Sequence, residues 1–192
     1  MMFKLFIWPG FLLLLLAQWL VPLQMIRKKD KVLDKGTSYK FETAPVDPSN
    51  PFMGKYIVLN FKENSLKLAS TKKFSYISKV YVSFSAGKNG FAKIKSIDIT
   101  KPQINDYLET TINYISSEKD SATIFLNYPF SKFYMEEYKA PTAERIYRER
   151  NPDSTLKVYA LVKIYNGDAV VKDVYVNDSL INDVIKARNI IR

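Results

Sequence analysis

The chain has 192 residues and a formal net charge of +10, and it contains neither His nor Cys. Those two absences exclude Cys nucleophiles, Ser-His-Asp triads, disulfides and the ordinary zinc and haem sites. No phosphate-binding loop, EF-hand loop or dinucleotide fingerprint is present, so we expect no cofactor and no metal. The positive charge is spread along the chain, which favours a membrane surface or an acidic partner and argues against nucleic acid.

Residues 5–26 form an apolar run that contains no charged residue. At about 1.5 Å of rise per residue this run makes about 33 Å of helix, enough to cross a bilayer core. A cleaved signal peptide is the alternative, but bulky residues between Ala17 and Pro22 stand where a peptidase needs small ones. We therefore predict a retained single-pass transmembrane anchor that follows a short flank, residues 1–4.

Residues 27–36 form a basic juxtamembrane segment. It can contact anionic lipid through Arg27, Lys28, Lys29 and Lys31. A solvated spacer after the anchor explains the same charges. The positive-inside rule alone would leave the rest of the chain in the cytoplasm, whereas a long C-terminal domain can be translocated regardless of flanking charge. Charge alone therefore leaves the orientation open.

Residues 37–177 show the period-two alternation of half-buried β-strands. Tyr39 and Phe41 fall on one strand face, and Val80, Val82 and Phe84 fall on another. Further strands are expected at 56–61, 93–99, 122–128, 156–165 and 169–176, while residues 101–117 fit either period. Asn166-Gly167 predicts a tight hairpin turn, and residues 87–90 predict another turn.

We therefore predict a mainly β fold after the transmembrane helix, a β-sandwich or partly open barrel of about seven to nine strands with short helices. The predicted core consists of Tyr39, Phe41, Tyr56, Leu59, Phe61, Val80, Val82, Phe84, Ile97, Ile99, Ile124, Leu126, Val158, Ala160, Val162, Val174 and Val176.

Two segments are expected to be helical. Pro141 can occupy the first turn of a short polar helix over residues 141–150. Residues 178–192 are predicted to be a C-terminal helical extension, in which Asp178 caps a helix over 179–188.

The most distinctive stretch runs from Thr43 to Phe61. Three prolines within residues 45–51 favour extended or turn conformations, and Gly54 gives a flexible corner before a strand. The run GKYIVLNF at residues 54–61 resembles the signature of the GDYXXLXY proteins, a family of uncharacterised bacterial membrane-anchored proteins. Lys55 replaces the acid of that motif and Phe61 replaces its final Tyr.

A second, weaker similarity lies in Phe133-Tyr134-Met135-Glu136, which resembles an aromatic-x-x-Glu segment of the family. The resemblance implies a protein of the bacterial cell envelope, anchored in the cytoplasmic membrane by a single span. It also implies that the body lies outside the cytoplasm and works beside a polytopic membrane partner.

The candidate binding residues are Asp47, Gly54, Tyr56, Leu59, Phe61 and Glu136. A loop whose shape is fixed by proline and glycine is suited to presenting binding groups from a rigid sheet. Structural roles explain the same residues: a turn at Asp47, a corner at Gly54, a buried strand over 56–61 and a solvated face at Glu136.

Two functions of different classes fit these observations. The first is a non-catalytic envelope module that binds a membrane protein or an envelope component. The second is a tethered hydrolase with a Ser–Lys pair, such as Ser131-Lys132 or Ser78-Lys79. A lysine base must be desolvated, and these lysines alternate with apolar residues in a way that directs them to solvent. We therefore expect no enzymatic activity and assign no catalytic residue.

Overall fold

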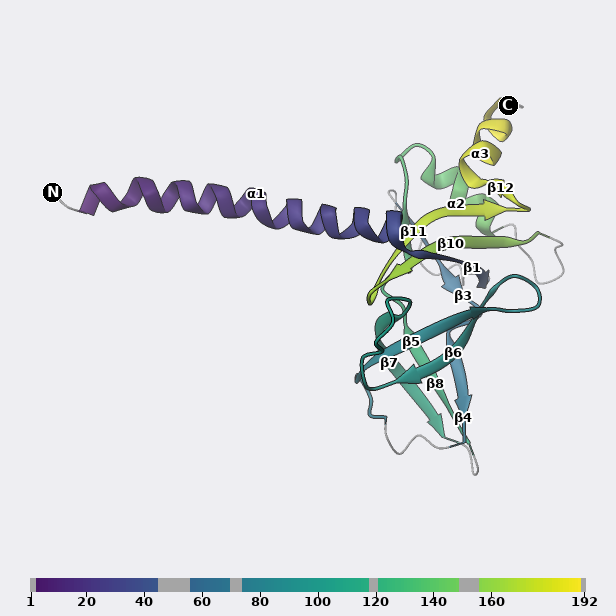
Figure 1. Cartoon of the computed structure of the whole chain (residues 1–192). Coiled ribbons are helices and arrows are strands. Elements are labelled where there is room, and N and C mark those ends of the chain that lie inside the picture. Colours follow the sequence, from purple (N-terminus) through teal and green to yellow (C-terminus); the bar gives the residue numbers. More distant parts are fainter. Residues whose placement is uncertain (1–2, 45–55, 70–73, 118–120, 149–155, 191–192) are drawn as a thin grey trace.

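A computed structural model describes residues 3–44, 56–69, 74–117, 121–148 and 156–190 (Figure 1). Its most prominent element is helix α1 (Phe3–Lys35), which projects from a β-rich body. Residues Pro9–Lys35 of this helix are long and apolar enough to cross a membrane. The body does not cover the large apolar side chains between Phe11 and Ile26, and Trp19 is 78% exposed. The predicted N-terminal apolar helix is therefore confirmed.

The body consists of antiparallel β-sheets, which confirms the predicted fold class. One five-stranded sheet has the order β12 (Ser179–Leu180), β11 (Asp168–Val176), β10 (Val158–Tyr165), β1 (Thr37–Ala44), β3 (Asn60–Phe61). The other has the order β4 (Ser65–Leu68), β8 (Ala122–Asn127), β7 (Leu108–Ser117), β5 (Lys79–Ala86), β6 (Ala92–Asp98). A two-stranded ribbon pairs β2 (Tyr56–Val58) with β9 (Lys132–Tyr134).

The two large sheets meet where the β10–β11 turn touches the start of β7. The amide of Gly167 donates to the carbonyl of Tyr107, and the amide of Glu109 donates to the carbonyl of Gly167, each at 2.9 Å. These bonds continue the hydrogen bonding from one sheet to the next, so the body is barrel-like and nearly closed. The predicted Asn166-Gly167 turn is confirmed, because both residues have positive φ angles, 47° and 88°.

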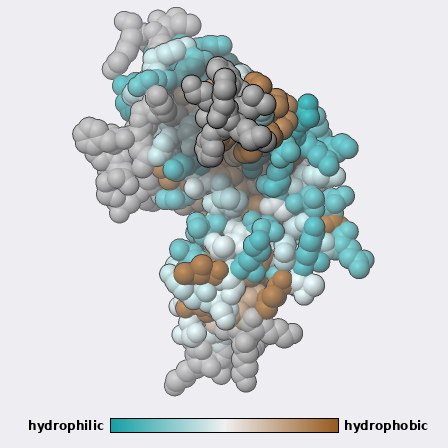
Figure 2. Space-filling model, turned by 90° about the vertical axis from the view of Figure 1, so that its left-hand side faces the viewer, coloured by the Kyte–Doolittle hydropathy of each residue, from teal (hydrophilic) through white to brown (hydrophobic). Residues whose placement is uncertain are grey.

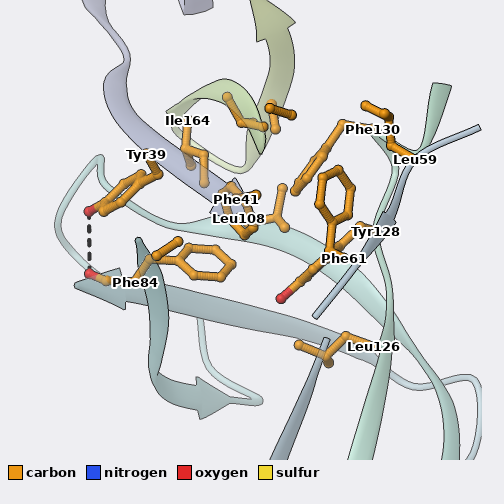
Figure 3. Close-up of a cluster of buried hydrophobic side chains, with 14 of the residues drawn as sticks. Tyr39, Phe41, Leu59, Phe61, Phe84, Leu108, Leu126, Tyr128, Phe130 and Ile164 are labelled. Atoms are coloured by element: carbon orange, nitrogen blue, oxygen red, sulfur yellow. Dashed lines mark hydrogen bonds between the residues drawn. The ribbon is translucent and has the colours of Figure 1, made fainter. Parts of the chain in front are cut away.

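An aromatic cluster fills the space between the sheets (Figure 3). The ring of Phe41 lies 5.1 Å from Phe84, 5.2 Å from Phe130 and 5.5 Å from Phe61. Tyr39 closes one side of the cluster, and its hydroxyl donates to the carboxylate of Asp106 at 2.6 Å and lies 3.3 Å from the carbonyl oxygen of Phe84. These rings come from β1, β3, β5 and the β8–β9 connection, so burial of their apolar surface holds the sheets together.

The predicted core is confirmed at all but two positions. Ile99 is 49% exposed, because β6 ends at Asp98 and Ile99 lies beyond the strand. Within β6, a β-bulge opposite Ser83 and Phe84 changes the alternation and buries Ile94 together with Ile97. Tyr56 is only half-buried, because the strand face that points into the core carries Ile57, which is 3% exposed.

The helices correct one prediction. Helix α2 (Ala140–Arg148) lies close to its predicted position, but α3 (Ile181–Ile190) begins three residues after Asp178. Asp178 is not the helix cap: it adopts a φ of 63° in the turn before β12 and accepts a hydrogen bond of 2.8 Å from the Tyr159 hydroxyl. The ambiguous residues 101–117 are a strand from Leu108 onward.

Candidate functional site

The first functional feature is the junction between α1 and the body. The helix continues without interruption through the basic juxtamembrane segment to Lys35, and Val32 in its last turns is 2% exposed. The ammonium of Lys28 lies 2.7 Å from the carboxylate of Asp168, and that of Lys29 lies 3.7 Å from it. Two of the four residues predicted to contact lipid therefore form ion pairs with the β10–β11 hairpin.

Gly36 makes the sharp connection from α1 to β1. Its amide donates to the carbonyl of Val32 at 2.9 Å, and its carbonyl accepts from the ammonium of Lys163 at 3.3 Å. A Cβ atom at this position would stand 2.4 Å from the Val32 oxygen and 3.1 Å from the Ile164 oxygen. Because both are backbone atoms, only glycine lets the helix end approach β10 this closely.

The second feature is the signature segment, which with the strand that follows it links all three sheets. Within the signature, residues 56–58 pair with β9 and residues 60–61 pair with β1, and the next strand, residues 65–68, pairs with β8. Leu59 and Phe61 are 1% and 5% exposed, and the Leu59 amide donates to the carbonyl of Ser131 at 2.8 Å. Both side chains are therefore parts of the core and cannot contact a partner directly.

The two segments that resemble the family lie side by side in the ribbon. Ile57 pairs with Phe133, and Tyr56 pairs with Tyr134, whose ring centroid is 5.3 Å away. The ammonium of Lys132 lies 4.7 Å from the centre of the Tyr56 ring, within the range of a cation–π contact. Tyr134 is 66% exposed, so the ribbon presents an aromatic and positively charged surface.

Glu136 lies just after this ribbon, in the turn that leads to α2. Its side chain is 56% exposed and accepts a 2.9 Å hydrogen bond from the ammonium of Lys139. Hydrogen bonds from Tyr138 and Lys139 hold the pKa of Glu136 below its usual value. The carboxylate is therefore charged and accessible, with Tyr138 beside it at 72% exposure.

A groove of about 650 Å³ opens where α1, β9 and β11 meet. It is lined by Lys29, Pro129, Phe130, Lys132, Phe133, Tyr134 and residues 169–172. Figure 2 shows the face of the body around the helix, where hydrophilic residues predominate. The sequence pattern missed this site, because its residues come from three distant segments that only the folded chain brings together.

The predicted binding residues Asp47 and Gly54 lie outside the described residues. Among the residues that the structure describes, no cluster of three or more acidic side chains is suited to holding a metal ion.

The two Ser–Lys pairs lack the desolvated lysine that a serine hydrolase would need. Lys79 is exposed and lies 2.8 Å from the carboxylate of Glu109. The hydrogen bond to Glu109 raises the pKa of Lys79, which is the opposite of what a general base requires. Lys132 is also exposed, with its ammonium on the Tyr56 ring.

The GDYXXLXY protein family model matches residues 18–174, from the second half of α1 into β11. The chain therefore belongs to the GDYXXLXY family, as its signature segment and the second ribbon strand had indicated. No curated protein and no solved structure matches it. The match ends before α3, although α3 packs on the body with Ile181 and Ile185 each 1% exposed.

Proposed function

We propose that this protein is a non-catalytic module of the bacterial cell envelope, anchored in the cytoplasmic membrane by α1 with its body outside the cytoplasm. Its role in this proposal is to bind a polytopic membrane protein or another envelope component. The observation that carries the proposal is the continuity of α1. One helix contains the apolar span and also packs against the body through Val32, Gly36 and the ion pairs of Asp168.

This continuity gives the body a defined position. Gly36 follows Ile26, the last residue of the apolar span, by ten positions, which is about 15 Å of helix. A flexible linker would let the body sample many orientations. A helix fixed to the β10–β11 hairpin instead holds the same face of the body toward the bilayer, where a membrane partner would meet it.

The surface proposed for the partner combines Tyr134, Glu136 and Tyr138. Exposed tyrosines supply large contact area at low entropic cost, and a carboxylate that stays charged supplies polar specificity. Tyr134 and Tyr138 are 66% and 72% exposed, and the body leaves their rings available. Asp47 and Gly54 stay candidates for the same surface from the sequence alone.

The proposal is tested by isolating the tagged full-length chain from its native membranes in mild detergent and identifying bound proteins by mass spectrometry. The variants are Glu136→Ala and Tyr138→Ala, and the matched control is Tyr76→Ala, because Tyr76 is also 65% exposed but lies before β5. We expect a reproducible membrane partner with the wild type and the control, and at least a tenfold loss with the Tyr138 variant.

Recovery of no partner by the folded, anchored wild type would contradict the proposal. Equal recovery by all variants would place the binding surface elsewhere and refute the assignment of Glu136 and Tyr138. Thermal midpoints measured in parallel separate loss of binding from loss of fold. Because Glu136 and Tyr138 are exposed, their substitution is expected to leave the midpoint nearly unchanged.

A further inference from the structure

The groove between α1, β9 and β11 combines an apolar and a positively charged lining. Its apolar part includes Phe133 and Val170, and its polar part includes Lys29, Lys132 and Lys172, and none of the described lining residues is acidic. The three lysines come from the helix, from β9 and from β11. A ligand that fits this lining has a negative charge attached to an apolar portion.

The charge of the groove is only partly compensated. Lys29 shares the carboxylate of Asp168 with Lys28, which holds it at the shorter distance. Lys132 has a neutral partner, the ring of Tyr56. Among the described residues, no carboxylate lies within ion-pair distance of Lys132 or Lys172. Two ammonium groups are therefore available to an anion.

The position of Lys29 places the groove beside the bilayer. Lys29 follows the last apolar residue of the span by three positions, about 4.5 Å along the helix. The headgroup region extends about 5–8 Å beyond the hydrocarbon core on each side. In a membrane-spanning α1, Lys29 thus lies at the depth of the lipid phosphates, and Tyr134 in the same lining is a residue type that favours this interface.

We propose that this groove binds one anionic phospholipid from the leaflet that faces the body. The phosphate contacts Lys132 and Lys172, and the glycerol and first acyl segments lie against Phe133 and Val170. The inference rests on the anchoring role of α1 in the proposed function. Because the three lysines come from three separate elements, lipid binding would also stabilise the orientation of the body on the membrane.

The test uses the full-length chain in nanodiscs of phosphatidylcholine that contain a small fraction of a photoactivatable phosphatidylglycerol. After illumination, the cross-linked peptides are identified by mass spectrometry. The binding variant is Lys132→Gln combined with Lys172→Gln. The matched control is Lys95→Gln, because Lys95 is an exposed lysine on β6 in the other large sheet.

We expect cross-links to residues 129–134 and 169–172 in the wild type and the control. Each lysine near an anionic leaflet contributes about a fivefold gain in affinity, so the double variant should require roughly 25-fold more phosphatidylglycerol for the same yield. Equal yields from the double variant and the control would overturn the proposal. Equal yields from a photoactivatable phosphatidylcholine would do the same, since they would show that the negative charge is not recognised.

Incorporation into the nanodisc is measured separately, by size-exclusion chromatography. Failure of the wild type to incorporate would refute the anchoring role, whereas incorporation without groove cross-links would refute only the lipid site. Recovery of the membrane protein partner is measured in a separate experiment, so that its outcome and the outcome for the lipid site can be told apart.

Discussion

Replacing Gly36 with Ala tests the link between the anchor and the body. The added Cβ would lie 2.4 Å from the Val32 oxygen, about 1 Å closer than an ordinary contact, and 3.1 Å from the Ile164 oxygen. Relief of the first overlap requires the backbone between Val32 and Gly36 to change at the end of α1. Relief of the second requires this junction to move away from β10, and we expect a total cost of about 1–3 kcal/mol, as for an overpacked core. For a chain of this size, each kcal/mol lowers the melting temperature by about 2–4 °C, so we expect a decrease of about 2–12 °C.

The assay is thermal unfolding of the full chain in detergent micelles, followed by circular dichroism of the β-sheets. Gly10→Ala is the matched control in the same helix, because apart from the adjacent helix backbone no described atom lies within 4 Å of its Cβ position. The control should melt with the wild type or slightly above it. If the Gly36 variant also melts with the wild type, the close packing of the helix end on β10 is not a stabilising contact. The claim that α1 is held rigidly against the body would then be wrong.

Three further predictions address the core, the pH dependence and the absence of catalysis. Phe41→Ala should destabilise the body by about 3–5 kcal/mol in denaturant unfolding, because Phe41 is fully buried among the rings of three other phenylalanines; a loss below about 1 kcal/mol would contradict its central place in the core. Burial and the hydrogen bond to Asp178 raise the pKa of Tyr159 to about 12. The protonated form is thus favoured in the folded state, and its stabilising contribution is complete below pH 10 and disappears as the pH rises toward 12. Tyr159→Phe should therefore reduce the loss of stability between pH 10 and pH 12, and an unchanged slope would disprove this assignment. A serine-reactive covalent probe should not label the full chain, whereas stoichiometric labelling of Ser131 or Ser78 would revive the hydrolase alternative.

Most of the body could be predicted because local patterns and tertiary packing agree there. Tyr39 and Phe41 alternate with polar residues and point into one core, and Asn166-Gly167 has residue types that adopt this tight turn easily. Ile99 could not be predicted correctly, because its alternation with Ile97 does not show that β6 ends at Asp98. The bulge in the β5–β6 pair, which buries Ile94 together with Ile97, has no signal in the segment itself either, because a bulge depends on pairing between distant strands.

The candidate sites were less accessible from the sequence. The signature segment was identified correctly, but its pattern could not show that Leu59 and Phe61 are core residues while Tyr56 faces Tyr134. The groove had no local signal at all, since Lys29, Lys132 and Lys172 are each ordinary exposed lysines in the sequence. Their common position follows from the packing of α1 on the β10–β11 hairpin.

The central claim is that α1 spans the membrane and leaves the body outside the cytoplasm. Because the chain has no Cys, single cysteines can report the location of each side. The Asn166-Gly167 turn is a poor position, since Tyr107 donates to the Asn166 side chain at 2.8 Å and Gly167 has a φ of 88°. Lys88, exposed in the β5–β6 turn, is better.

The decisive measurement is therefore labelling of Lys88→Cys and Lys4→Cys with a membrane-impermeant maleimide, before and after lysis of spheroplasts. The proposed orientation predicts that the Lys88 variant reacts in intact spheroplasts and that the Lys4 variant reacts only after lysis. The reverse pattern would place the body in the cytoplasm. Labelling of both variants in intact spheroplasts would show that α1 does not separate the two sides of the membrane, and either result would contradict the account.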